Sequence, residues 1–497
     1  MTSKVRINLL KTGVPGLDEV LGGGLPEFSF NLIAGQPGSG KTTLAHQIMF
    51  TLATPERSAM YFTVLGEPPL KMLRYQQQFD FFDSEAIDRS VRFINLSEDA
   101  MAGDFDAVLQ RIVAEVTRHA PALVFVDSFR SVMLANEAEG NPHNTLQKFV
   151  QQLGMLMTSW QATTFLLGEY FTETDANPVF TVADGLIWIR QSAQRNSVVR
   201  KLEILKMRGQ ATRPGLHTLR ITSAGIQVFS PARAALPAQA EASAPPHAAR
   251  LLMGVPQLDA MLGGGLPRGY SLLVAGPSGS GKSLLASAFL AEGARAGENG
   301  VIAAFELRPT RARNAELAEL IASGRVGLVD STAPDLSIDE VLLLLVGEIR
   351  RLKATRVVID SLSGFELSVA PTFREDFRES LLRMVKSLAG EGVTVLMISE
   401  LEDRYTELSF SPYGTAFLTD AIIVQRYIEV DSQLRRMMAV VKVRASAHSH
   451  ELREFSIDAS GLRIGAMLTD QEGLLGGRPT RKRDNAPPAA GTKASDG

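Results

Sequence analysis

The chain of 497 residues contains no cysteine. This absence excludes a disulfide framework, a thiolate metal site and a cysteine nucleophile. It also suits a reducing compartment, and we expect the protein to be cytoplasmic. The chemistry of this chain therefore has to be sought in other residue types.

Long apolar runs and a strong excess of charge are also missing. No run approaches the ~20 residues that a membrane helix needs, and Val341 to Val346 is only a short core stretch. The first residues include Lys4, Arg6 and Lys11 and lack the apolar region of a signal peptide. The net charge of −3 and the pI near 6.2 give no general attraction to nucleic acid or to an anionic membrane. We therefore expect neither as a partner.

Two glycine-rich motifs are the most informative feature that is present. Residues 35–42 (GQPGSGKT) and 276–283 (GPSGSGKS) both match the phosphate-binding pattern G-x-x-x-x-G-K-[ST]. Each follows a short apolar segment, 30–34 or 270–275, that favours a buried strand, and each precedes a segment that favours a helix, Leu44 to Thr51 or Leu284 to Ala291. Such a loop directs backbone N–H groups and a helix dipole at a polyphosphate. The predicted nucleotide-binding residues are Gly35, Gly38, Ser39, Gly40, Lys41, Thr42, Thr43, Gly276, Gly279, Ser280, Gly281, Lys282, Ser283 and Leu284.

The two halves of the chain repeat each other at a constant offset of 241 residues. Residues 13–18 (GVPGLD) return as 254–259 (GVPQLD), and 21–26 (LGGGLP) return as 262–267. The two loop lysines have the same offset. A period of this length indicates a duplicated domain rather than a solenoid repeat.

The duplication gives a domain plan. We expect a first α/β domain over residues 1–230, an Ala/Pro-rich linker over 231–250 and a second α/β domain over 251–465. Residues 466–497 form a carboxyl-terminal segment with a tail that we expect to be disordered. At 45% hydrophobic residues the chain can bury two substantial cores.

Each half also has a strand that ends in an aspartate. Residues 123–127 (LVFVD) and 357–360 (VVID) are apolar and rich in β-formers. In a parallel sheet their aspartates would lie beside the phosphate loop, where Asp127 and Asp360 would hold Mg²⁺ together with the hydroxyls of Thr42 and Ser283. Capping of a following helix is the commoner use of such an aspartate.

Hydrolysis further needs a group that orients the attacking water. In the second half an apolar segment, 301–305, ends at Glu306, where a general base is expected. In the first half the corresponding segment continues through Leu65 and Gly66, and its first carboxylate is Glu67. We predict Glu306 and Glu67 as the catalytic bases, although both could be surface residues at strand ends.

The order of these motifs, given twice, resembles the KaiC family, the circadian clock proteins among the RecA/RadA-like ATPases. The likeness runs from about Thr12 to Pro479 and implies two tandem RecA-like P-loop NTPase domains that use ATP and Mg²⁺. It extends to 202–209 (LEILKMRG) and 440–445 (VVKVRA), which look like the family's Lys-x-Arg strand. The resemblance implies that Lys206, Arg208, Lys442 and Arg444 reach the γ-phosphate of a neighbouring subunit in a ring, a homohexamer in KaiC. A cation placed in trans stabilises the transition state.

This sequence departs from the family at two places. The adjacent glutamates of KaiC are reduced to Glu306 followed by Leu307, and the aligned positions of the first half are Leu65 and Gly66. The family's phosphoacceptor Ser-Thr pair falls on Ala416 and Phe417, which carry no hydroxyl; Thr415, Thr419 and Ser411 lie nearby. We therefore expect a weak or altered autokinase activity.

Three functions remain open at this point. The first is a KaiC-like ring ATPase in signalling or timing, including an autokinase with shifted phosphosites. The second is a RadA-like DNA-dependent ATPase, although 136–144 (NEAEGNPHN) and 402–413 (EDRYTELSFSPY) are not the basic loops that bind single strands. The third is a scaffold gated by ATP. The sequence leaves open whether the partner is a KaiB-like protein, a KaiA-like protein, a histidine kinase or none.

Overall fold

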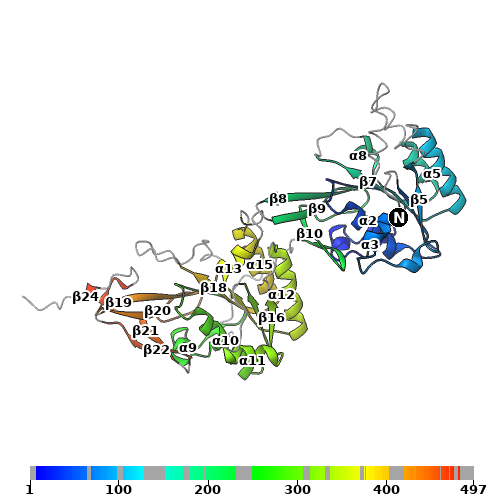
Figure 1. Ribbon diagram of the computed structural model, residues 1–497. Helices are drawn as coiled ribbons and strands as arrows, with labels where there is room; N and C mark the ends of the chain where they lie inside the picture. Colours follow the sequence, from blue (N-terminus) through cyan, green and yellow to red (C-terminus); the bar gives the residue numbers. More distant parts are fainter. Residues whose placement is uncertain are drawn as a thin grey trace, which may run out of the picture. The chain divides into compact units, whose positions relative to one another are not determined.

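The chain divides into two compact units, Met1–Pro231 and Ala232–Gly497, and each is considered by itself. The computed structural model in Figure 1 describes residues 7–63, 69–97, 105–127, 151–157, 159–171, 178–194, 197–230, 249–305, 314–330, 336–369, 374, 377–401, 419–430, 432–458, 461–469, 471–474 and 480–481. The side chains of residues 69, 70, 105, 106, 178, 194, 471, 472, 480 and 481 are not part of this description.

The described part of the first unit is built on a nine-stranded sheet. Its spatial order is β11-β10-β9-β8-β3-β7-β6-β4-β5. The pairs from β8 to β5 are parallel, and the pairs from β8 to β11 are antiparallel. The strands are β3 (Phe30–Gly35), β4 (Ala59–Thr63), β5 (Val91–Asn95), β6 (Leu123–Asp127), β7 (Thr163–Glu169), β8 (Gly185–Gln194), β9 (Ser197–Met207), β10 (His217–Thr222) and β11 (Gly225–Phe229).

The second unit repeats this sheet strand for strand. Within the described residues its order is β16-β15-β17-β18-β14-β19-β20-β21-β22, again parallel up to β19 and antiparallel beyond it. The strands are β14 (Ser271–Gly276), β15 (Gly300–Ala304), β16 (Val326–Asp330), β17 (Arg356–Asp360), β18 (Thr394–Glu400), β19 (Ala421–Val430), β20 (Gln433–Val443), β21 (Arg453–Asp458) and β22 (Gly461–Met467). The predicted fold class, two tandem RecA-like α/β domains, is confirmed.

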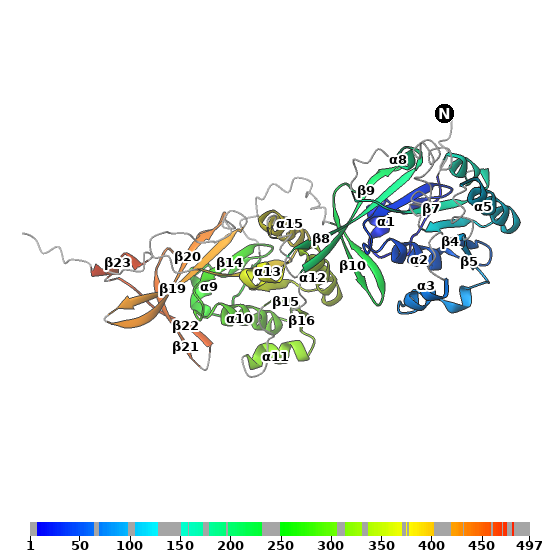
Figure 2. The same ribbon diagram turned by 45° about the horizontal axis from the view of Figure 1, so that its top comes forward.

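Helices cover the faces of each sheet (Figures 1 and 2). Those of the first unit are α1 (Leu17–Val20), α2 (Lys41–Leu52), α3 (Pro69–Gln76), α5 (Phe105–His119) and α8 (Pro178–Val182). Those of the second are α9 (Pro256–Met261), α10 (Lys282–Arg295), α11 (Ala315–Ala322), α12 (Ile338–Leu352), α13 (Leu362–Ser368) and α15 (Phe377–Gly390). Short strand pairs β1 (Leu9–Leu10) with β2 (Leu25–Pro26), β12 (Arg250–Leu251) with β13 (Leu266–Pro267), and β23 (Gln471–Glu472) with β24 (Thr480–Arg481) complete the description.

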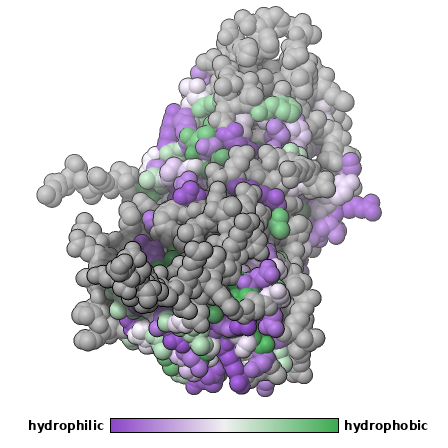
Figure 3. Space-filling model, turned by 90° about the vertical axis from the view of Figure 1, so that its left-hand side faces the viewer, coloured by the Kyte–Doolittle hydropathy of each residue, from purple (hydrophilic) through white to green (hydrophobic). Residues whose placement is uncertain are grey.

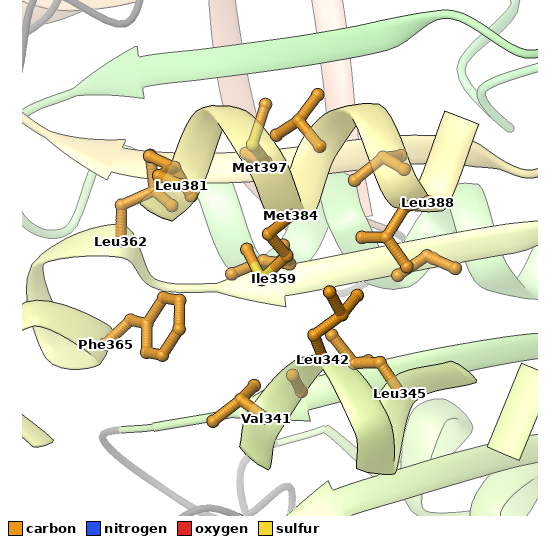
Figure 4. Packing of buried hydrophobic residues seen from close by; sticks show 14 of the residues in the cluster. Val341, Leu342, Leu345, Ile359, Leu362, Phe365, Leu381, Met384, Leu388 and Met397 are labelled. Carbon is orange, nitrogen blue, oxygen red and sulfur yellow. The ribbon is translucent and has the colours of Figure 1, made fainter. Parts of the chain in front are cut away.

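Helix α12 shows how the sequence sets these elements. It begins with a capping box in which Ser337 and Glu340 bond each other's backbone N–H groups, and its last turn carries Arg350 and Arg351, which suit the negative end of the helix dipole. Its buried face contacts α15 and the sheet in a cluster that includes Val341, Leu342, Leu345, Leu381, Met384, Leu388, Ile359 and Met397 (Figure 4). Apolar residues at helical spacing thus seal one side of the second sheet.

The described helices and one face of the surface show how apolar side chains are distributed. None of the described helices is long and apolar enough to cross a bilayer. On the face drawn in Figure 3, hydrophilic and hydrophobic side chains of the described residues are interspersed. Isolated exposed apolar residues of this kind are normal for a folded domain.

The repeated motif that ends in Leu-Asp is a turn fixed by its aspartate. Asp18 Oδ1 accepts hydrogen bonds from the N–H of Thr12 at 2.9 Å and from its Oγ1 at 2.8 Å. In the second unit Met253 stands in place of Thr12, and among the described residues Asp259 Oδ1 accepts one hydrogen bond, from the Met253 N–H at 2.7 Å. Burial raises the pKa of Asp259 to about 6. The buried carboxylate of the second turn therefore lacks the hydroxyl donor that Thr12 supplies in the first turn.

This loss predicts a pH dependence of the second unit's stability. Because the folded-state pKa of Asp259 is raised, the folded chain binds this proton more tightly than the unfolded chain, and the unfolding free energy falls as pH rises from roughly 4 to 6. We expect Asp259→Asn to be more stable than the parent at pH 8, by about 1 kcal/mol after solvent screening, and the difference to close near pH 4.

Urea unfolding can assign the effect to one unit. Trp160 and Trp188, the two tryptophans of the chain, both lie in the first unit, so their fluorescence reports that unit alone, whereas far-ultraviolet circular dichroism reports both. The stabilisation should appear in circular dichroism and not in fluorescence. A difference between variant and parent that is the same at pH 4 and pH 8 would contradict the prediction.

Candidate functional site

Both phosphate-binding motifs lie between a fully buried central strand and a helix. The first connects β3 to α2 and the second connects β14 to α10. Each helix begins at the loop lysine. Helix α2 therefore begins three residues before the predicted start at Leu44, and α10 begins two residues before the predicted start at Leu284. Gly40 and Gly281, at the helix N-caps, have φ of 108° and 99°, which glycine adopts without strain. The free N–H groups of both helix starts therefore point into the loops.

The loop lysines fold back over their own loops. Lys41 Nζ donates to Gln36 O at 2.9 Å, and Lys282 Nζ donates to Gly276 O at 2.9 Å and Pro277 O at 2.7 Å. Burial lowers the pKa of Lys41, while the charges of Glu169 and Asp127 act in the opposite direction. Each ammonium group is thus held where a bound phosphate would replace the carbonyl contacts.

In the first unit the predicted metal-binding pair is assembled. Asp127 ends β6, and its Oδ2 accepts hydrogen bonds from Thr42 Oγ1 at 2.9 Å and from the Tyr61 hydroxyl at 2.7 Å. Burial raises the pKa of Asp127, and the bonds from Tyr61 and Thr42 act against that rise. A hydroxyl and a carboxylate next to a phosphate loop are the oxygen donors that Mg²⁺ takes in nucleotide sites, so the residues fit this ion.

A cleft of about 360 Å³ lies over the first loop. It is lined by Gly38, Gly40, Lys41, Thr42, Thr43, Thr63, Met72, Asp127, Glu169 and Ile221. The glycine loop, the lysine, the predicted metal ligands and Thr43 therefore share one cavity. Glu169 belongs to this set because β7 pairs with β3 in a register that places Glu169 beside Gly35.

The second unit has an equivalent cleft of about 470 Å³. It is lined by Ser278, Gly279, Gly281, Lys282, Ser283, Leu284, Asp360, Ser361, Ile398, Glu400, Arg436 and Ile457. Glu400 lies beside Gly276 in the pairing of β18 with β14, as Glu169 does in the first unit. The loop serine Ser280 donates from Oγ to Gln425 Oε1 at 2.9 Å, whereas its counterpart Ser39 is buried with no partner for its hydroxyl among the described contacts.

The four predicted trans-acting cations lie at the opposite end of the sheets. Arg208 donates to Asp184 Oδ1 at 3.0 Å, and Asp184 Oδ2 accepts the N–H of Phe30, the first residue of β3. The loop follows the last residue of this six-residue strand, so the two ends are about 16 Å apart. Lys206 Nζ donates to Phe180 O at 3.2 Å and to Thr181 O at 3.0 Å.

The second unit repeats this arrangement. Arg444 donates to Asp420 Oδ1 at 3.2 Å, Asp420 Oδ2 accepts the N–H of Ser271 at 3.0 Å, and Lys442 Nζ donates to Thr419 O at 2.6 Å. Burial, with the adjacent arginine as a smaller cause, lowers the pKa of both Lys206 and Lys442. None of the four cations lines either described cleft of its own chain.

The two predicted general bases, Glu67 and Glu306, lie outside the described residues, as do Ser411, Thr415, Ala416 and Phe417. Thr419 is described, and its side chain is completely buried.

Comparison with known proteins agrees with this architecture. The family described as “ATPase: KaiC” matches residues 10–233 and 251–468, one match for each sheet. The chain belongs to the KaiC family of ATPases.

Curated relatives extend over nearly the whole chain. The circadian clock oscillator protein KaiC of Rippkaea orientalis is 29% identical over 488 residues, which cover 96% of this chain and 92% of that relative. KaiC 1 of Synechocystis is 28% identical with the same coverage, and KaiC of Thermosynechococcus vestitus is 27% identical over 96% of this chain and 93% of that relative.

The structure adds residues of this KaiC-family chain that sequence reasoning missed. Glu169 and Glu400 end strands next to the loop strands, and an apolar run that ends in glutamate, as in 395–400 (VLMISE), was the available signal. Tyr61 lies inside an apolar strand and gave no signal of its own. Arg436 reaches the second cleft from β20, far away in the sequence.

The lysine geometry predicts two independent nucleotide sites. A charge-assisted hydrogen bond to phosphate contributes about 1.5–3 kcal/mol, so Lys41→Ala and Lys282→Ala should each weaken one site by about 10- to 100-fold. Equilibrium dialysis of the full chain with a non-hydrolysable ATP analogue should give two bound nucleotides for the parent and one for either variant at a concentration that just saturates the parent. Two nucleotides bound to both variants would overturn the assignment of the loops.

Proposed function

We propose that this chain is an ATP-binding and ATP-hydrolysing ring protein that acts as a signalling or timing module. ATP and Mg²⁺ occupy both loops, Thr42 and Asp127 hold the metal in the first site, and Ser283 and Asp360 hold it in the second. Glu306 and the displaced Glu67 serve as the general bases that orient water. The ring is a homohexamer in the cytoplasm with ATP between subunits. A KaiB-like, KaiA-like or histidine-kinase protein is its proposed partner.

The observation that carries this proposal is the position of the lysine–arginine pairs. Arg208 and Arg444 are held at the beginning of the loop strand, about 16 Å from the loop at its end. An arginine side chain cannot cover that distance within its own domain. The cations can act on a γ-phosphate only if a second copy of the chain brings its loop to them, and that need couples hydrolysis to assembly.

Mixing two inactive variants tests the shared site. Lys282→Ala removes the phosphate ligand of the second loop, and Arg444→Ala removes the cation that acts on the neighbour. Each homogeneous ring should hydrolyse ATP at least ten times more slowly in its second domain, since an arginine of this kind contributes ~10³–10⁵ in rate. In a random mixture an interface is intact where the loop of an Arg444→Ala subunit, which keeps Lys282, meets a Lys282→Ala subunit, which keeps Arg444. This combination occurs at about a quarter of the interfaces, so about a quarter of the activity should return.

Two controls complete the experiment. The double variant Lys282→Ala/Arg444→Ala should restore nothing when mixed with either single variant, because no loop that keeps Lys282 then meets a neighbour that keeps Arg444. Light scattering with and without Mg-ATP should show the assembled species in every mixture. A monomer under all nucleotide conditions would contradict the proposed ring. Assembled mixtures that recover no activity would contradict the proposed site shared between subunits.

We further propose that autokinase activity is weak or altered. Phosphoryl transfer needs a hydroxyl held in line with the γ-phosphate. Thr419 lies two residues before β19, and its side chain is 0% exposed. Its carbonyl oxygen accepts a hydrogen bond from Lys442 Nζ. A phosphate there would have to displace a packed segment, so the burial of Thr419 argues against this residue, and we propose Thr415 as the acceptor.

Prolonged incubation with Mg-ATP followed by intact-mass and phosphopeptide analysis measures this activity. We expect well under one phosphate per chain, on Thr415, and its loss in Thr415→Val. Thr419→Val serves as the matched control and should leave the small signal unchanged. Two phosphates per chain at high occupancy between residues 411 and 419 would show that a full autokinase survives.

Two other readings predict different results. A DNA-dependent ATPase should show turnover that rises with single-stranded DNA and a strongly salt-dependent affinity, for which the net charge of −3 offers no driving force. A scaffold gated by ATP should assemble with ATP and show no turnover at all. The mixing experiment separates that scaffold from the proposed enzyme.

A further inference from the structure

The hydroxyl of Tyr61 contacts the predicted metal-binding carboxylate of the first site from inside the protein. Tyr61 lies on β4 and is completely buried. Its hydroxyl donates to Asp127 Oδ2 at 2.7 Å, the same oxygen that accepts the Thr42 bond at 2.9 Å. The Tyr61 ring is enclosed by His46, Phe93 and Phe125, with ring centroids 4.6, 5.5 and 5.9 Å away. The hydroxyl is therefore held in one place.

The second site has no such donor at the corresponding position. The offset of 241 residues places Ile302 opposite Tyr61. The strand registers agree, because Tyr61 pairs with Phe125 on the strand that ends at Asp127, and Ile302 pairs with Val358 on the strand that ends at Asp360. The phenol is thus a property of the first site, and the isoleucine of the second site cannot donate a hydrogen bond.

We propose that Tyr61 is a positioning residue for metal binding at the first nucleotide site. Mg²⁺ bound with a nucleotide would take a lone pair of the Thr42 oxygen, and the carboxylate of Asp127 would have to keep its direction while that contact changes. A buried carboxylate is held in one direction by its donors, and the loss of a donor to a buried charge is unfavourable. The Tyr61 bond remains, since it comes from the side of the core. It keeps the Asp127 carboxylate directed at the loop. This inference rests on the proposed nucleotide site and specifies how its metal is held.

Removal of the hydroxyl should weaken the effect of Mg²⁺ and leave the nucleotide contacts intact. Tyr61→Phe keeps the ring packed against His46 and Phe125 and deletes only the donor. Because a hydrogen bond to a charged group is involved, we expect about a tenfold loss of nucleotide affinity in Mg²⁺. In EDTA the affinity should be unchanged, since Tyr61 does not line the cleft.

The experiment uses the full chain with Lys282→Ala, so that binding reports the first site. A fluorescent, non-hydrolysable ATP analogue is titrated in Mg²⁺ and in EDTA, for Tyr61→Phe and for Tyr61→Ile, which installs the residue of the second unit. Both should lose affinity in Mg²⁺ alone. Tyr75→Phe, an exposed tyrosine on α3, is the matched hydroxyl deletion and should bind as the parent does. Nucleotide-free melting followed by tryptophan fluorescence checks that each variant folds.

A double-mutant cycle with Asp127→Asn decides whether Tyr61 acts through the carboxylate. In that background Tyr61→Phe should have no further effect on the Mg²⁺ dependence. An equal loss in Mg²⁺ and EDTA, or a loss that persists with Asp127→Asn, would overturn the positioning role. Failure of the Lys282→Ala parent to bind nucleotide would instead overturn the proposed first site itself.

Discussion

The start of each loop strand is held by a carboxylate, and the geometry of both sites depends on that contact. Asp184 accepts the N–H of Phe30 with one oxygen and an Arg208 bond with the other, and Asp420 does the same for Ser271 and Arg444. This contact fixes where the strand begins. Since the strand is six residues long, it also fixes where the loop lies and keeps the arginine at the far end. In each domain one carboxylate therefore holds the arginine at the end of the strand that is remote from the phosphate loop.

Parallel pairing around that strand then decides which side chains meet over the loop. The carboxyl ends of β6 and β7 bring Asp127 and Glu169 to the same edge, and β17 and β18 bring Asp360 and Glu400. In open parallel sheets, ligand sites form at this edge. The clefts are thus a consequence of strand order, and the loops supply the chemistry for phosphate.

The parts of the site that the sequence predicted are the local ones. A phosphate loop is contiguous, and an apolar run that ends in aspartate, such as residues 123–127, needs only the knowledge that the sheet is parallel. Tyr61 and Arg436 could not be predicted in the same way. Their place in the site depends on strand registers and on an antiparallel extension, which link residues far apart in the chain. Offset comparison of the two halves would have marked Tyr61 as a difference, although not as a hydrogen-bond donor.

The two halves differ in the layer directly behind the loops. In the first unit His46 on α2 is fully buried against Tyr61, and burial lowers its pKa to about 4, so it packs as a neutral aromatic ring. At the same place in α10 the second unit has Ser287, which donates to Ser283 O and accepts from Asn314. At this one position the first loop helix packs through an aromatic ring and the second through a small polar network.

That difference bears on how the two sites respond to a nucleotide. In both sites the resting contacts are internal: Lys41 and Lys282 bond their own loop carbonyls. At the lysines a phosphate therefore replaces existing bonds, so only the surplus of those new contacts stabilises the bound state. In the first site part of the old network, the Tyr61–Asp127 bond, does not have to break, because it lies behind the carboxylate. We infer that the first site keeps one of its internal contacts when a metal–nucleotide complex binds, whereas Ile302, at the position of Tyr61 in the second unit, supplies no donor there.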